Sequence, residues 1–189
     1  MMNDKKILEN GVVNFFYKKE EYRCLSNFWE SDIVMGEENR EYESGEHCFH
    51  GEKYIRLGKL CEDENRKRIL IEYGGKFLKP SVYKGGNVVK KMGGKKGLLL
   101  SNVELGLWND ISVEVQNEIC KYKKEKYEEV RGDLIKSKGK FLIHPALRCS
   151  EEGLKKKIWE GKGVVVDGKI DILGKNRLGN IWMLIRDEL

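Results

Sequence analysis

The spacing of apolar residues along the chain predicts several helices and a few short strands. Between residues 110 and 130, apolar side chains recur every three or four positions, which is typical of one face of an amphipathic helix. Ser44 is a good N-cap and Gly58 a plausible stop for an earlier helix. Three shorter helices are therefore predicted at residues 44–57, 61–73 and 180–189.

Short apolar runs bounded by turn residues predict the strands. Residues 13–16 and the pair 33–35 and 40–42 are expected to form a small antiparallel sheet near the N-terminus. Val164–Ile172 is expected to be a hairpin, because Asp167-Gly168 is a favoured tight turn. The glycines and lysines of residues 85–97 predict a basic loop. The expected fold class is α+β: one helix-rich domain spanning residues 1–189, with a small antiparallel β component.

Composition narrows the class of protein. Hydrophobic residues make up 40% and charged residues 35% of the 189 positions, as in a globular protein that is polar but not disordered. No stretch reaches 18 consecutive apolar residues, and the first residues contain no apolar segment typical of a signal peptide. We therefore expect a cytoplasmic protein with no membrane partner. The net charge of +5 permits an anionic partner without requiring one.

The segment Ser44–Tyr54, SGEHCFHGEKY, carries the most suggestive chemistry. On a helix, Glu46 and Lys53 are seven residues apart, so they differ by only about 20° in direction and lie about 10.5 Å apart along the axis. Their carboxylate and amine would share a face with His50. The alternative is a solvated stripe of charged pairs worth a few tenths of a kcal/mol each.

Metal and thiol chemistry are less favoured by the spacing. His47, Cys48 and His50 are possible ligands, but neighbouring helical residues point about 100° apart. The five cysteines are far apart with no CxxC pair, which argues against a zinc cluster and a disulfide framework. We therefore expect no metal and no cofactor.

Two glycine-containing segments could meet an anion. GKNRLG, residues 174–179, precedes the last helix, where amide groups and the helix dipole favour negative charge; it could equally be a turn and a cap. The lysines of residues 85–97 could face phosphates, although the spacing is not that of a P-loop. The tryptophans are core residues by default, and each also offers a flat face to a base.

Taken together and in order, these motifs resemble the NADAR family of YbiA-like N-glycosidases. The matching segments are LSNFW (25–29), GEHCFHGEKY (45–54), Trp108, WEGKG (159–163) and GKNRLGNIWMLIRDEL (174–189), and they span most of the chain. Members of this family hydrolyse N-glycosidic bonds, in phosphorylated riboflavin-biosynthesis intermediates or in ADP-ribose attached to guanine bases. The resemblance thus implies an N-glycosidase, with ADP-ribose-containing or ribose-phosphate compounds, including ADP-ribosylated nucleic acid, as substrates.

The resemblance also implies roles for individual residues. Glu46 would stabilise the developing cation or activate water, and Lys53 would hold the ring-oxygen side of the ribose or form a Schiff base with it. Residues implied in substrate binding are Ser26, Asn27, Phe28, His47, His50, Trp108, Trp159, Gly174, Asn176 and Gly179.

The chain departs from the family pattern at two positions. His50 replaces a common glutamine, and Lys156 stands where many relatives have an aspartate before the tryptophan. With the other lysines, Lys156 favours ADP-ribosylated nucleic acid over a small monophosphate. Three alternatives stay open: a glycosidase of riboflavin intermediates, a non-catalytic ADP-ribose or NAD-binding module, and a plain nucleic-acid binder.

Overall fold

A computed structural model describes residues 3–147 and 149–189 of the chain. Its contacts divide the chain into two compact units. The central unit is Asn27–Lys123, and the terminal unit combines Met1–Ser26 with Lys124–Leu189. The fold is the helix-rich α+β class predicted from the sequence. The expectation that the whole chain is one domain stays a prediction.

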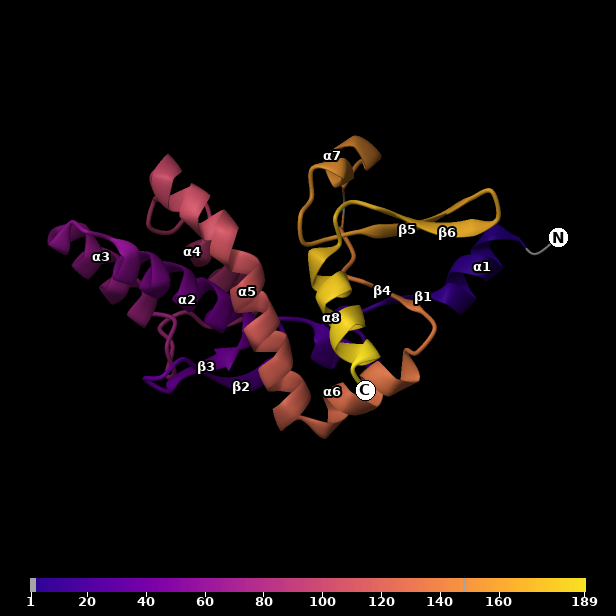
Figure 1. Cartoon of the computed structure of the whole chain (residues 1–189), viewed down its shortest axis with the longest axis horizontal. Helices are drawn as coiled ribbons and strands as arrows, with labels where there is room; N and C mark the ends of the chain where they lie inside the picture. Colours follow the sequence, from indigo (N-terminus) through magenta and orange to yellow (C-terminus); the bar gives the residue numbers. More distant parts are fainter. Residues whose placement is uncertain (1–2, 148) are drawn as a thin grey trace. The chain divides into compact units, whose positions relative to one another are not determined.

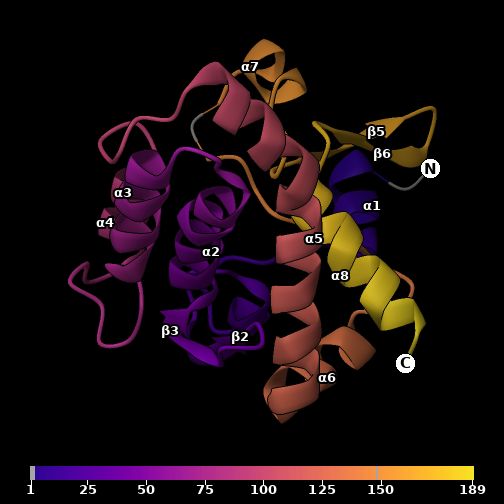
Figure 2. The same ribbon diagram turned by 60° about the vertical axis from the view of Figure 1, so that its left-hand side comes forward.

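The central unit is built around helix α2. The antiparallel strands β2 and β3 lead into α2, which is followed by three further helices (Figure 1). Figures 1 and 2 both show α5 running beside α2. The elements are β2 (Glu30–Met35), β3 (Arg40–Ser44), α2 (Gly45–Leu60), α3 (Glu64–Gly75), α4 (Gly86–Gly93) and α5 (Asn102–Lys126).

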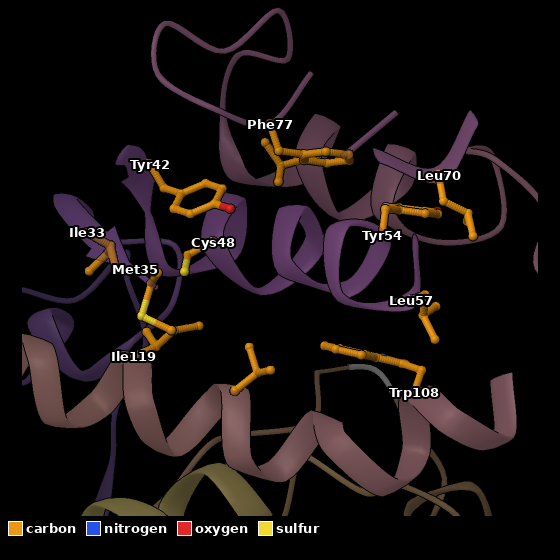
Figure 3. Packing of buried hydrophobic residues seen from close by; sticks show 12 residues of the cluster. Ile33, Met35, Tyr42, Cys48, Tyr54, Leu57, Leu70, Phe77, Trp108 and Ile119 are labelled. Carbon is orange, nitrogen blue, oxygen red and sulfur yellow. The ribbon is translucent and has the colours of Figure 1, made fainter. Parts of the chain in front are cut away.

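Apolar side chains from α2, α3 and α5 form the core of this unit. Figure 3 shows Trp108 and Ile119 of α5 directed toward α2, with Leu57 and Cys48 among the residues they face. Tyr42 of β3 lies in the same cluster and is fully buried. Each such large side chain contributes about 1.5–3 kcal/mol on burial, so this cluster is what holds the helices against one another.

Several helices differ from the sequence prediction, and for α2 the reason is a tertiary contact. The helix predicted at 61–73 begins at Glu64, and the one predicted at 180–189 begins at Arg177. Gly58 does not stop α2, which continues to Leu60. A Cβ at Gly58 would lie 2.6 Å from Ile71 Cγ1 and 3.2 Å from the Lys67 carbonyl oxygen, so this glycine lets α3 pack closely. The predicted loop at 85–97 contains helix α4, and the predicted 110–130 helix is two helices that break at Tyr127.

The terminal unit contains short strands and helices from both ends of the chain. Strand β1 pairs with β4 in parallel, so the prediction that residues 13–16 join an antiparallel N-terminal sheet is wrong. The β5–β6 hairpin is confirmed, with positive φ at Asp167 (49°) and Gly168 (74°) in its turn. The elements are α1 (Asp4–Gly11), β1 (Val12–Asn14), η1 (Arg23–Leu25), α6 (Glu128–Lys136), β4 (Phe141–Ile143), α7 (Glu151–Lys155), β5 (Lys162–Val166), β6 (Lys169–Leu173) and α8 (Arg177–Asp187).

Helix α8 anchors the terminal unit. Its Trp182 is fully buried and donates a 2.8 Å hydrogen bond from Nε1 to the carbonyl oxygen of Leu25. Arg186, near the C-terminal end of α8, donates hydrogen bonds to the carbonyl oxygens of Ser137 (2.9 Å) and Lys140 (2.7 Å). These bonds join segments that are distant in the sequence.

Candidate active site

The start of α2 is fixed by Ser44 and Asn27. The Ser44 hydroxyl accepts a hydrogen bond from the His47 amide (3.3 Å), as the sequence predicted for an N-cap. The Asn27 carbonyl oxygen accepts one from the Glu46 amide (2.8 Å). A Cβ at Gly45 would lie 2.9 Å from the Asn27 side-chain oxygen, so only glycine allows this approach. The Glu46 carboxylate consequently lies in the first turn, where the helix dipole favours negative charge.

Glu46, His50 and Lys53 follow one another along one face of α2. His50 Nε2 lies 3.2 Å from Glu46 Oε1, and Lys53 is on the next turn. Glu46 and Lys53 are each only 7% exposed. The solvated-stripe alternative is therefore wrong, because these charged groups are buried rather than turned to solvent.

Lys53 is held by the C-terminal end of α4. Its amine donates a short hydrogen bond to the Gly93 carbonyl oxygen and lies 4.5 Å from the centre of the Tyr54 ring. Burial lowers the pKa of Lys53 to about 8, and the nearby Glu46 carboxylate opposes part of that effect. A large fraction of the amine is thus neutral near pH 8, as a nucleophile requires.

Helix α4 contacts this face of α2 at Gly93 and contacts the Phe28 ring, which precedes β2, at Gly86. A Cβ at Gly93 would lie 2.0 Å from His50 Cγ, and one at Gly86 would lie 2.8 Å from the Phe28 ring. The Lys90 amine lies 5.9 Å from the centre of that ring, in a cation–π contact. The glycine-rich segment therefore packs on the candidate catalytic face.

His47 and Asn27 make hydrogen bonds inside the protein. His47 Nε2 donates to the Tyr83 carbonyl oxygen (3.0 Å), and its Nδ1 shares a 2.8 Å hydrogen bond with the Ser44 hydroxyl. The side-chain amide of Asn27 pairs reciprocally with that of Gln116, at 2.7 and 3.0 Å. These contacts position α2, while the predicted roles of both residues in substrate binding stay predictions.

Trp108 lies in the core cluster of the central unit. It is 8% exposed, and its ring meets Phe49 of α2 edge to face at a centroid distance of 4.9 Å. The structure places Glu46, His47, His50, Lys53, Asn27, Phe28 and Trp108 in the central unit.

The other predicted site residues belong to the terminal unit. Asn176 is 1% exposed, donates from Nδ2 to the Leu142 carbonyl oxygen (2.9 Å) and accepts from the His144 amide (3.1 Å). A Cβ at Gly179 would lie 2.1 Å from the Leu142 carbonyl oxygen, and Gly174 has a positive φ of 83°. These features give the GKNRLG segment a structural function at the start of α8.

Three backbone amides of this segment are also hydrogen-bonded within the terminal unit. The amides of Lys175, Asn176 and Arg177 donate to the carbonyl oxygens of residues 157, 160 and 158, each at 3.0 Å. Trp159 is half-buried between α7 and β5, and Ser26 is buried after η1. Their binding roles stay predictions.

Three residues of the central unit were not singled out from the sequence. Gln116 forms a hydrogen bond with the Asn27 side chain, and the Gly93 carbonyl oxygen accepts one from Lys53. Glu52 is a fully buried carboxylate on α2. Burial alone would raise the pKa of Glu52, but its hydrogen bonds, above all from Arg40 (2.9 Å) and from the Tyr42 hydroxyl (2.7 Å), lower it overall. Gln116 and Gly93 have partners distant in sequence, so no local pattern distinguishes them; the only local signal for Glu52 is Arg56 four residues later, which donates to it at 2.9 Å.

Residues 3–147 and 149–189 contain neither a cluster of metal ligands nor a membrane-spanning helix. No group of three or more His, Cys, Asp and Glu side chains that could hold a metal ion is found there. In the same residues, every helix is too short or too polar to span a bilayer.

Comparison with known proteins supports the fold. The chain is similar to the NMR structure of the E. coli protein YbiA, with a TM-score of 0.56 and 21% sequence identity over 100% of this chain and 86% of that one. No family model matches the chain, and no curated protein does. The likeness shows a YbiA-like helix-rich α+β fold, which agrees with the resemblance found in the sequence.

Proposed function

We propose that the protein is an N-glycosidase of the NADAR type that hydrolyses the bond between ribose and a nitrogen base. The observation that carries the proposal is the buried face of α2, on which Glu46 and Lys53 lie with His50 between them. Breaking a ribosyl C1–N bond builds positive charge at C1 and the ring oxygen. A fixed carboxylate stabilises that charge, and a neutral amine can attack C1.

Two routes are compatible with this pair. In the first, Glu46 accepts a proton from a water molecule that attacks C1, and the base leaves with a proton from solvent. In the second, neutral Lys53 attacks C1, the base leaves, and ring opening produces a Schiff base that water then hydrolyses. The lowered pKa of Lys53 favours the second route.

The surface of α4 favours a polyanionic substrate. Lys90 and Lys91 of α4, and Lys95 and Lys96 just after it, are exposed, and Lys90 contacts Phe28 in the same unit as Glu46. Positive charge of this kind attracts nucleic-acid phosphates. We therefore propose ADP-ribosyl hydrolase activity on ADP-ribosylated guanine in nucleic acid, with phosphorylated riboflavin-biosynthesis intermediates as the second candidate.

The experiment offers the protein ADP-ribosylated DNA, ADP-ribosylated protein, NAD and riboflavin-pathway intermediates, and detects released ADP-ribose or ribose phosphate by mass spectrometry. We expect release from ADP-ribosylated DNA by wild type and by Glu41→Gln, which changes an exposed glutamate of β3, but not by Glu46→Gln. Binding of ADP-ribose without release from any substrate would instead identify a binding module.

A further inference from the structure

The imidazole ring of His50 has a hydrogen-bond partner at one nitrogen and none at the other among the described residues. Nε2 lies 3.2 Å from Glu46 Oε1, and both side chains are about nine-tenths buried, with 12% and 10% exposed. Nδ1 is buried with no hydrogen-bond partner in the part of the chain that the structure describes. The ring therefore makes its hydrogen bond only through Nε2.

Helix α4 covers the side of the ring that carries Nδ1. A Cβ at Gly93 would lie 2.2 Å from His50 Nδ1, so the glycine backbone lies directly against that nitrogen. Phe49 packs edge to face against the ring at 5.6 Å, and Phe77 lies 6.2 Å away. These neighbours restrict the ring, and a proton on Nδ1 would have no acceptor. The proton of the neutral ring consequently belongs on Nε2, from which it is donated to Glu46.

We propose that His50 is a positioning residue: it donates from Nε2 to Glu46 and orients the carboxylate toward the sugar, without contacting substrate. Among the described residues, His50 supplies the side-chain hydrogen bond to the Glu46 carboxylate. A donor on one carboxylate oxygen fixes the orientation of the group and leaves the other oxygen for the reacting atoms, as an orienting residue does in catalytic pairs and triads. The proposal rests on the glycosidase function proposed above.

The test compares three substitutions that differ in where, or whether, the side chain carries a hydrogen-bond donor. His50→Gln can place an amide nitrogen near the Nε2 position, His50→Asn places one near the Nδ1 position, and His50→Leu removes the donor. With ADP-ribosylated DNA as substrate, we expect kcat to fall about 10–100-fold in the Asn and Leu variants, as for loss of a hydrogen bond to a charged group. KM should stay within about twofold, and His50→Gln should retain kcat within about threefold.

A measurement that needs no activity separates this proposal from the proposed function. The ¹⁵N shifts of the His50 ring should show the Nε2–H form, and Glu46→Gln should shift the Nε2 signal. A raised KM at unchanged kcat, an unaffected Leu variant, or an Nδ1–H or doubly protonated ring would each overturn the role of His50. A wild-type protein without glycosidase activity but with the Nε2–H form would refute only the proposed function.

Discussion

The buried amine of Lys53 should make the stability of the protein depend on pH in a specific direction. Burial lowers its pKa from the ordinary 10.5 to about 8. At 1.36 kcal/mol for each pKa unit, this corresponds to about 3 kcal/mol between the protonation states. Between pH 8 and 10.5 the unfolded chain keeps the proton that the folded protein has released, so the free energy of unfolding rises with pH.

The assay is urea unfolding of wild type and Lys53→Met at several pH values from 7 to 10.5, in the presence of a reducing agent. The difference between the two proteins isolates Lys53, because titration of the other groups largely cancels. Relative to Lys53→Met, wild type should gain about 3 kcal/mol of stability over this range. Lys91→Met, which removes an exposed lysine of α4, controls for the loss of one positive charge.

The outcome of this experiment bears directly on the covalent route. A constant difference between wild type and Lys53→Met would show that the amine is as well solvated in the folded protein as in the unfolded chain. A loss of relative stability with rising pH would show that Glu46 outweighs burial. Either result would remove the physical basis for a neutral lysine nucleophile near pH 8.

Three further results are expected. Glu46→Gln should lower kcat about 10²–10³-fold, about 2.7–4 kcal/mol of transition-state stabilisation, and near-normal activity in the folded variant would exclude Glu46 from the chemistry. Lys53→Arg should abolish activity and borohydride trapping of a sugar adduct if the amine attacks C1, because the guanidinium stays protonated; an active variant with no adduct in wild type would leave direct water attack. Gly93→Ala should lower the free energy of unfolding by about 1–3 kcal/mol, because the new Cβ would lie 2.0 Å from His50 Cγ. Gly106→Ala, which has open space around it in α5, should raise the free energy of unfolding by up to about 1 kcal/mol. Equal thermal shifts for the two variants would refute the close packing of α4.

Local features of the sequence were enough for several elements. Ser44 caps α2 as predicted, because a hydroxyl at that position bonds an amide of the first turn whatever the rest of the fold does. The Asp167-Gly168 turn formed for a similar reason, since positive φ is tolerated there. The shared face of Glu46 and Lys53 followed from helical periodicity alone.

The remaining features needed the tertiary structure. Gly58 is a stop signal in isolation, yet α2 continues through it because the packing of α3 outweighs the weak preference of one glycine. Helix α4 buries Val89 in the core cluster. Its last carbonyl oxygens accept hydrogen bonds from Lys53 and Tyr73, which lie outside the helix, so the composition of this segment alone indicated a loop. The burial of Lys53, and hence its lowered pKa, depends on the same helix. Spacing along the chain therefore determined which groups share a face, whereas long-range packing decided which of them are removed from water, and with that their chemistry.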